Sequence, residues 1–328
     1  MRRSGLSLKW LEVFQIAART GSVKAVAAET GLSASTVSHH LRCLDEALGL
    51  SLIDHGHRPM VLTREGAVFL RYVDGALNLL SRAEAEVHSG TIAQTRNLRL
   101  GLIEDFDSVI APEMARTLAL SLPDCVFRHV TRPSHEILDL VRRRELDLGV
   151  ATRPQFEVEG LTELPLLRDP FVLVVPAETG FAAEDFLNAR SDLPFLRFSQ
   201  QQIMGTRIET QLRRMRIALP NRFEFESNQS LMGMVAAGGG WATSTPTNFL
   251  RAQRFHAQTR MLPFPGKGFS RSICLYVADG CPPGVTSLVS ATLRRLIQSR
   301  SIDPALDLAP WLAGAFHLAP ETEPSPES

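Results

Sequence analysis

Residues 32–48 combine side chains that can bind nucleic acid with an apolar helical stripe. The apolar members are Val37, Leu41, Leu44 and Leu48. They recur at i, i+4, i+7 and i+11, which is the spacing of one face of an α-helix. The other face carries hydroxyls, an imidazole and a guanidinium but no acid, at Ser35, Thr36, Ser38, His39 and Arg42. Because such groups can contact phosphates and base edges, this face is suited to a DNA major groove.

A second short helix is predicted immediately upstream, from Val23 to Glu29, and it ends at the Thr30-Gly31 break. Two helices joined by a tight turn that contains glycine are typical of a helix-turn-helix, whose second helix enters the major groove. Residues 52–62 then predict a two-stranded wing with a tip at residues 55–59, where Arg58 can bind phosphate. The predicted DNA contacts are Ser33, Ala34, Ser35, Thr36, Ser38, His39, Arg42 and Arg58.

The composition is that of an ordinary globular protein. The 328 residues carry a formal net charge of zero, with 44% hydrophobic and 21% charged residues. Residues 1–66 are only slightly basic, with about 8 Lys or Arg against about 6 acids. DNA binding requires a local basic surface rather than a basic chain, so this balance does not exclude a nucleic-acid partner.

The pattern along the chain predicts an N-terminal all-α winged helix-turn-helix, a long linker helix and a C-terminal α/β domain of two lobes. The C-terminal domain alternates short apolar strands with helices, which indicates mostly parallel sheets. Residues 304–328 are rich in Pro, Glu, Ser and Ala, which is typical of disorder beyond residues 311–318. The predicted boundaries are 6–66 for the winged helix-turn-helix, 64–89 for the linker helix, 90–97 for a hinge, 98–300 for the two-lobed domain (lobe I about 98–166 and 268–300, lobe II about 167–267) and 301–328 for a largely disordered tail.

The linker helix is predicted to join two copies of the chain. Its apolar residues follow the 3.5-residue spacing of a coiled-coil seam. They are Leu70, Val73, Leu77, Leu80 and Val87. Because a single helix with such a seam is not stable alone, it needs a partner surface. We expect a partner chain, and packing on the chain's own C-terminal domain is the alternative.

Strand ends predict a ligand site in the C-terminal domain, because open α/β sheets bind ligands beyond the carboxyl ends of strands and against helix N-termini. The residues selected are Asp105, Phe106, Ser108, Thr131, Ser134, Ser199, Gln201, Thr206, Asn228 and Thr245. The acids Glu104, Asp105 and Asp107 leave two interpretations open. They favour a cationic ligand, or Asp107 only caps the next helix while the others interact with its dipole.

No metal, cofactor or enzymatic activity is expected. The four cysteines, Cys43, Cys125, Cys274 and Cys281, form no C-x-x-C pair, although Cys274 and Cys281 leave a redox pair open. His39-His40 and His55-x-His57 lack the further ligands of a metal site. No nucleophile elbow, phosphate loop or dinucleotide fingerprint is present. The chain also has no signal peptide and no apolar run of about 18 residues, so a cytoplasmic location without membrane contact is expected.

Together these residues resemble the LysR-type transcriptional regulators. The matching positions are Leu11, Phe14, Gly21-Ser22, Ala25, Ala27, Leu32-Ser33, Thr36-Val37-Ser38, Leu41, Leu44-Asp45, Leu48-Gly49, Leu52-Ile53, Arg58, Leu62-Thr63 and Gly66. The resemblance implies a winged helix-turn-helix, a linker helix and a two-lobed periplasmic-binding-like domain that binds a small-molecule effector. It also implies three partners: double-stranded DNA, RNA polymerase and further copies of the chain, as dimers that pair into tetramers.

Two departures from the family pattern concern DNA recognition. Ala34-Ser35 stands where many members carry Gln-Pro or Gln-Ser, so a methyl that can meet thymine replaces a bidentate contact to adenine. His55 stands where arginine is common in the wing, which weakens one phosphate contact. The alternative function is a small-molecule-binding protein or an enzyme on the two-lobed fold, with the N-terminal domain used only for dimerisation.

Overall fold

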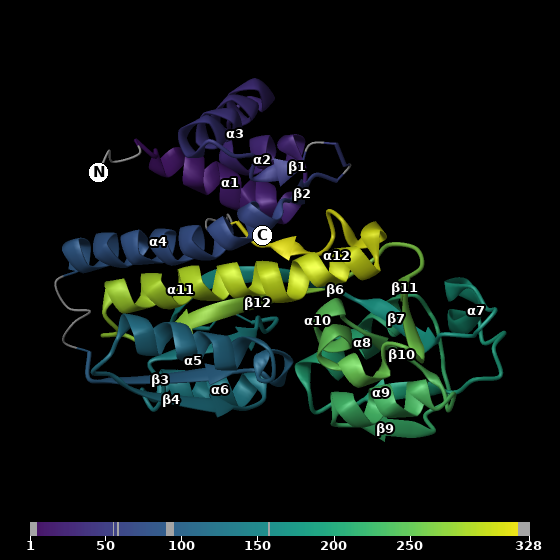
Figure 1. Ribbon diagram of the computed structural model, residues 1–328. Helices are drawn as coiled ribbons and strands as arrows, with labels where there is room; N and C mark the ends of the chain where they lie inside the picture. The colour runs from purple at the N-terminus through teal and green to yellow at the C-terminus, as the bar shows by residue number, and fades with distance from the viewer. Residues whose placement is uncertain (1–4, 55, 58, 90–94, 157, 321–328) are drawn as a thin grey trace. The chain divides into compact units, whose positions relative to one another are not determined.

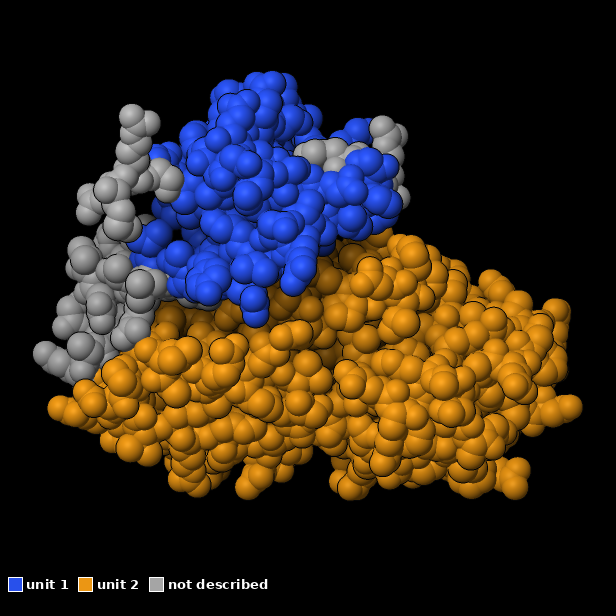
Figure 2. Space-filling model, in the orientation of Figure 1, with its two compact units in different colours: residues 1–88 blue, residues 89–328 orange. Residues whose placement is uncertain are grey.

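The computed structural model describes residues 5–54, 56–57, 59–89, 95–156 and 158–320. The chain divides into two compact units, residues 1–88 and residues 89–328 (Figure 2). None of the helices in these described ranges is both long and apolar enough to cross a membrane. The elements of the first unit are α1 (Leu8–Thr20), α2 (Val23–Thr30), α3 (Ala34–Leu48), β1 (Ile53–Asp54), β2 (Val61–Leu62) and α4 (Arg64–Ser89).

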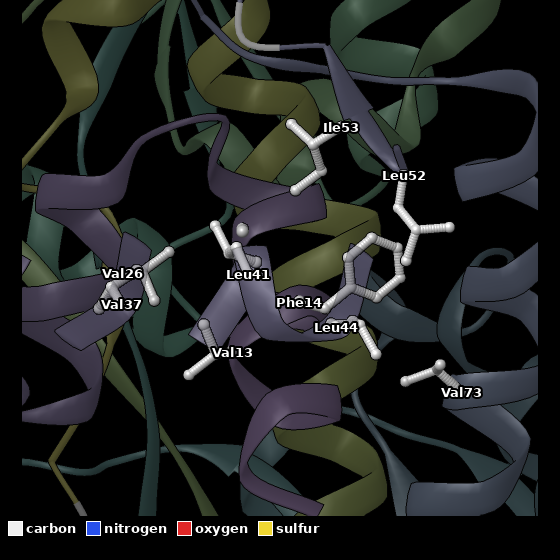
Figure 3. Packing of buried hydrophobic residues seen from close by; sticks show 10 residues of the cluster. Val13, Phe14, Val26, Val37, Leu41, Leu44, Leu52, Ile53 and Val73 are labelled. Atoms are coloured by element: carbon white, nitrogen blue, oxygen red, sulfur yellow. The ribbon is translucent and has the colours of Figure 1, made fainter. Parts of the chain in front are cut away.

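The core of the first unit forms where the helices bury their apolar stripes together (Figure 3). From the stripe of α3, Val37, Leu41 and Leu44 are at most 4% exposed. Phe14 of α1 is fully buried, and its ring centroid lies 5.7 Å from that of Phe69 on α4. Burying one such side chain stabilises the fold by about 1.5–3 kcal/mol, so this small core suffices to hold α3 in one orientation.

Local bonds fix the ends of α3 and the start of the wing. The Ser33 hydroxyl caps α3 by accepting a hydrogen bond from the Thr36 amide at 3.1 Å. At the other end, the Asp45 carboxylate accepts the Leu52 amide at 3.1 Å. Gly66 lies against the Leu52 carbonyl, where any Cβ would collide with the backbone oxygen. These contacts position the wing relative to α3. They give a structural reason for two sequence matches noted above, Leu44-Asp45 and Leu62-Thr63-x-x-Gly66.

The predicted seam of the linker helix is partly used inside the first unit. Leu70, Val73 and Leu77 pack against the core of that unit, and Val73 is 2% exposed. Val73 is therefore not free to pair with another chain, whereas Leu70 and Leu77 are only partly buried. Leu80 is 44% exposed, and the side chain of Val87 lies outside the described part of the chain. Among the α4 side chains that the structure describes, the large exposed apolar residues are Val68, Tyr72 and Leu80.

Two mixed sheets form the two lobes of the second unit (Figure 1). The lobe I sheet has the order β13-β6-β12-β5-β3-β4, with β3 (Asn97–Leu102), β4 (Val126–Thr131), β5 (Leu148–Thr152), β6 (Thr162–Pro170), β12 (Ser270–Val277) and β13 (His317–Leu318). The lobe II sheet has the order β11-β7-β10-β8-β9, with β7 (Val172–Pro176), β8 (Phe195–Phe198), β9 (Phe223–Phe225), β10 (Trp241–Ser244) and β11 (Thr259–Pro263).

Helices flank both sheets. Lobe I has α5 (Ile110–Ser121), α6 (Ser134–Arg142) and α11 (Pro283–Ile297), with a 3-10 turn at Glu104–Phe106. Lobe II has α7 (Ala183–Leu187), α8 (Ile203–Arg214), α9 (Asn228–Ala236) and α10 (Pro246–Arg251), with a 3-10 turn at Gln253–Phe255. Residues 90–94 of the predicted hinge lie outside the described residues, and β3 begins within the predicted hinge at Asn97.

The prediction of mostly parallel sheets is wrong. β3 runs parallel to β4 and β5, but β12 runs antiparallel to β5 and β6. In lobe II, β7 is antiparallel to both β10 and β11. The reason is that the chain crosses between the lobes twice, and the first strand after each crossing, β7 or β12, runs opposite to the other strands of its sheet that it pairs with. β6 and β11 were not predicted because proline and charged residues interrupt their apolar pattern.

The two crossings lie side by side at one aromatic contact. The chain passes from β6 to β7 at Phe171 and returns between β11 and β12 over residues 264–269. The Phe171 ring stacks on Phe269, with centroids 4.2 Å apart and planes 7° apart. The Phe171 amide also donates to the Phe269 carbonyl at 2.9 Å. The crossings therefore form a single hinge between the lobes.

The segment after α11 is folded, so the predicted disordered tail is wrong for residues 301–320. A π-helical turn (Gln298–Ile302), α12 (Asp303–Leu308) and a 3-10 turn (Pro310–Leu312) lead into β13, which pairs with β6. Phe316 is 1% exposed and Leu312 is fully buried. Composition suggested disorder, but these spaced apolar residues bury enough surface to order the segment. Residues 321–328 lie outside the described residues.

We expect Phe316→Ala to lower the free energy of unfolding of the second unit by about 3–5 kcal/mol, because it removes a buried aromatic ring and leaves a cavity. Trp311 lies in the same segment but is 43% exposed. Trp311→Ala is therefore expected to cost about 1 kcal/mol or less. Urea unfolding, monitored by circular dichroism, gives the free energy of unfolding of both variants. Equal losses of unfolding free energy in the two would contradict the packing of this segment.

Candidate DNA-binding face and interlobe cleft

The predicted recognition face lies on the outside of α3. Ser33, Ala34, Ser35, Ser38, His39 and Arg42 are exposed, and Thr36 is partly exposed. The hydroxyls are pre-oriented by local bonds, since Ser33 Oγ lies 2.8 Å from both Ser35 Oγ and Thr36 Oγ1. Ser38 Oγ donates to the Ala34 carbonyl at 3.0 Å. These oxygens keep free lone pairs, so the face can accept as well as donate hydrogen bonds.

Arg42, the cation of this face, has an acidic neighbour. Arg42 Nη2 lies 3.3 Å from His39 Nδ1, and Arg42 Nε lies 3.7 Å from Glu46 Oε1. The absence of acids predicted for this face therefore does not extend to its C-terminal end. Arg42 and Glu46 are each 68% exposed, so their pair is weak and leaves the guanidinium free to turn toward another anion.

The wing is a short antiparallel hairpin beside α3. Ile53 pairs with Leu62 and Asp54 with Val61. The Asp54 carboxylate accepts the Gly56 amide at 2.7 Å and lies 3.0 Å from His57 Nδ1. Of the two wing positions singled out in the sequence, Arg58 and His55 both lie outside the described residues.

A cleft of about 390 Å³ lies between the two lobes. Four of the predicted ligand-site residues line it: Asp105, Thr131, Ser134 and Asn228. Thr131 and Ser134 lie at the carboxyl end of β4 and the start of α6, as the strand-end rule predicts. Asn228 starts α9 on lobe II and is 2% exposed. Its Nδ2 donates to the Asn248 carbonyl at 2.9 Å, whereas its Oδ1 is buried without a hydrogen-bond partner.

The other predicted ligand-site residues do not line this cleft. Phe106, Ser199 and Thr245 are buried, with 1%, 3% and 0% exposed. Ser108 is exposed, because a 3-10 turn precedes α5 and the helix begins only at Ile110. Gln201 and Thr206 line a separate hollow between α6 and α8. The sequence rule missed other residues that line the cleft, including Gln202, Met204, Asn248 and Arg271.

The acidic loop at the cleft pairs with arginines rather than capping a helix. Arg251 of α10 lies 2.7 Å from Glu104 Oε1 and donates to Asp107 Oδ1 at 3.2 Å. Arg271 of β12 bonds Asp105. α5 has no side-chain cap, so the interpretation that Asp107 caps it is wrong. The three acids of this loop are thus paired within the protein, and they supply no unpaired negative charge to attract a cationic ligand.

Arg271 lies at the centre of these contacts. Its Nη2 donates to Asp169 Oδ2 at 2.8 Å on β6 and to Thr245 Oγ1 at 3.1 Å on lobe II, as well as to Asp105. The residue is 3% exposed, and Asp169 is fully buried. Burial opposes the charge of Arg271, but Asp105 and Asp169 raise its pKa above the ordinary value. Arg271 therefore remains charged and joins lobe I, the hinge strands and lobe II.

Two family models match this chain. Residues 8–67 match the bacterial regulatory helix-turn-helix protein, lysR family, and residues 93–299 match the LysR substrate binding domain. The chain belongs to the LysR family. This LysR-family protein is thus a DNA-binding transcriptional regulator with an effector-binding domain, and its family is not one of enzymes.

Individual relatives are distant. A "Probable hydrogen peroxide-inducible genes activator" of Mycobacterium xenopi is 29% identical over 170 residues, which cover 52% of this chain and 89% of the relative. The regulator CitR of Bacillus subtilis is 24% identical over 57% of this chain and 64% of its own length. For two further mycobacterial peroxide-inducible activators, the match spans only 53% and 60% of the relative.

Solved structures agree in fold. A Corynebacterium glutamicum OxyR variant has a TM-score of 0.54 and 22% identity, covering 93% of this chain and 95% of that chain. DarR of Vibrio fischeri, solved in complex with DNA, has a TM-score of 0.50 and 15% identity, covering 89% of this chain and 99% of that chain. At these identities the likeness supports the arrangement of a helix-turn-helix unit and two α/β lobes in this LysR-family regulator.

We expect Arg271→Gln to destabilise the second unit of this LysR-family protein by about 3–5 kcal/mol, because it leaves buried carboxylates without a counter-charge. Arg300→Gln is the matched control, since Arg300 pairs with Glu113 at 2.6 Å but is 51% exposed. Loss of that pair is expected to cost about 1 kcal/mol or less. Urea unfolding gives the free energy of unfolding of both variants. A loss for Arg271→Gln as small as that for Arg300→Gln would show that Arg271 is not needed for the stability of the second unit.

Proposed function

We propose that α3 reads an operator sequence and that a small molecule bound in the interlobe cleft modulates this activity. The observation that supports the proposal is that α3 exposes its polar side chains on one face, while its opposite, apolar face is buried in the core of the first unit. Ala34, Ser35, Ser38, His39 and Arg42 would contact bases or phosphates, and Ser33 and Thr36 would bond phosphates at the start of the helix. Arg58 of the wing is proposed to contact the backbone.

The proposed effector site draws on polar groups from both lobes. Thr131 and Ser134 face the cleft from lobe I, and Asn228 and Asn248 face it from lobe II. The Asn228 Oδ1 atom, buried without a partner, is suited to accept a hydrogen bond from a ligand hydroxyl, amide or amine. Because each lobe supplies part of the site, a ligand that contacts both would favour their closed arrangement.

A thiol-based peroxide response is the second candidate, because several relatives are named peroxide-inducible activators. Three of the four cysteines argue against it, including both members of the Cys274–Cys281 pair. Burial raises the pKa of both Cys125 and Cys281, and Cys274 is fully buried. A raised pKa lowers the thiolate fraction on which reaction with peroxide depends. We therefore favour a bound effector over a Cys274–Cys281 redox pair.

The proposed regulator works as a dimer that pairs into a tetramer on two DNA half-sites and contacts RNA polymerase. The exposed residues Val68, Tyr72 and Leu80 of α4 offer an apolar surface for a second copy. This surface includes Leu80 of the predicted seam, whereas Val73 of that seam is buried in the first unit. Because its proposed ligand is chromosomal DNA, we place the protein in the cytoplasm.

Footprinting on the DNA upstream of its own gene tests the proposal. In moderate salt, with unrelated DNA as competitor, we expect two separated protected patches. Binding that is equally strong on unrelated DNA and disappears with salt would reflect phosphate contacts alone. That result would favour the alternative of a ligand-binding protein whose first unit serves only dimerisation.

We expect Arg42→Ala to weaken operator binding by about 1–3 kcal/mol if Arg42 meets a base. Glu46→Gln should strengthen operator binding, because it removes the carboxylate 3.7 Å from Arg42 and with it the repulsion between that carboxylate and DNA phosphates. Electrophoretic mobility-shift titrations of both variants on the footprinted DNA give the two affinities. Unchanged affinity in both would remove this end of α3 from the DNA interface.

We expect the combined substitution Tyr72→Glu and Leu80→Glu to convert the protein to monomers, since two carboxylates cannot be buried in an apolar contact without a large cost. Ala67→Glu is the control, because Ala67 is exposed on α4 and lies about 100° or more around the helix from each residue of that stripe. Sedimentation velocity reports the mass of each variant. An unchanged mass for the double variant would exclude this face of α4 from the dimer.

A further inference from the structure

The second unit has another hollow besides the cleft, with a volume of about 450 Å³. We name it the α6–α8 groove, because it lies between α6 of lobe I and α8 of lobe II. Its apolar wall includes Leu138, Pro154, Phe156 and Ile203. Phe156 is 68% exposed, which is unusual for an aromatic ring in a protein whose other phenylalanines are largely covered. A hollow of this size is that of a small-molecule site.

Arg207 supplies a cation to this groove, and no carboxylate among the residues that the structure describes pairs with it. Its Nη2 donates to the Arg153 carbonyl at 2.7 Å and its Nη1 to the Ser270 carbonyl at 3.4 Å. Its Nε is buried without a hydrogen-bond partner. Burial and the nearby Arg271 charge lower the pKa of Arg207. By contrast, Arg251 and Arg271 both bond carboxylates, so Arg207 differs from the other arginines between the lobes.

The remaining charges of the groove cancel. Asp139 and Arg142 both line it, and Arg142 Nη1 donates to Asp139 Oδ1 at 2.9 Å. His135 is the other titratable group of the wall, and it lies on α6 beside the shared edge of groove and cleft. The polar residues Gln201 and Thr206 complete the rim. The groove thus combines one unmatched guanidinium with an apolar wall.

We propose that the α6–α8 groove is a second binding site, distinct from the cleft, for an amphipathic organic anion. A carboxylate would bond the Arg207 guanidinium, and an aliphatic or aromatic body would cover Leu138, Ile203 and Phe156. The ligand would contact both lobes, because α6 belongs to lobe I and α8 to lobe II. His135 and Ile203 line both the groove and the cleft. A ligand bound in the groove would therefore change the affinity of the cleft for its own ligand, and a ligand in the cleft would change the affinity of the groove by the same factor.

Calorimetric titration of the full chain with octanoate and with its neutral counterpart octanamide tests the proposal. We expect octanoate to bind wild type, and Arg207→Met to weaken it about tenfold or more through loss of the charge-assisted bond. Arg207→Lys should retain most of the affinity, because the charge remains. Thr131→Val, which changes only the cleft, should leave octanoate binding unchanged.

Phe156→Ala provides an independent variant, because an exposed side chain can be removed without unfolding the chain. It should weaken octanoate binding through loss of apolar cover, while circular dichroism stays unchanged. Equal binding of octanoate and octanamide, equal binding by wild type and Arg207→Met, or no octanoate binding at all would each overturn the proposal. Weakening by Thr131→Val instead of Arg207→Met would place the anion in the cleft and overturn it as well.

Discussion

The charge of one buried guanidinium constrains how the two lobes can meet. Arg271 is almost completely covered, and a buried cation is costly unless carboxylates and hydrogen-bond acceptors surround it. Asp169 comes from the neighbouring strand, Asp105 from the loop after β3, and Thr245 from lobe II. A movement that separates the lobes must therefore replace some of these bonds. The loop that carries Asp105 also forms one wall of the cleft, so the contents of the cleft and the hinge contacts are physically linked.

In the first unit, a small apolar core holds α3 so that the polar side of this helix faces outward. α3 buries Val37, Leu41 and Leu44, and the same helix therefore exposes its hydroxyls and cations on the other side. The Asp45 carboxylate then fixes where the chain leaves the helix toward the wing. Position on a helix, rather than excess charge, defines the candidate DNA-binding face of this nearly neutral chain.

The features that sequence predicted well are local ones. Helical spacing located α3 and its outer face, and glycines located the helix ends, because both depend on residues within a few positions of one another. The ion pairs of Arg251 and Arg271 join residues separated by 144 and 166 positions, and no local pattern announces such a pairing. Thr131, Ser134 and Asn228 were found because they sit at strand ends or helix starts. Thr206 was not placed correctly, because α8 begins at Ile203 and carries that side chain to the groove instead of the cleft.

The folded C-terminal segment has a consequence for the sheet of lobe I. β13 lies along β6 at Leu167 and Arg168, and the Ala319 amide donates to the Leu166 carbonyl at 3.0 Å. Next to these bonds, Arg294 donates to the Pro165 carbonyl at 3.0 Å. Unpaired strand edges are templates on which other chains can add strands and aggregate. Residues 317–319 thus protect this edge of β6 beside the hinge, and a chain shortened to end with α11 would leave the edge open for self-association.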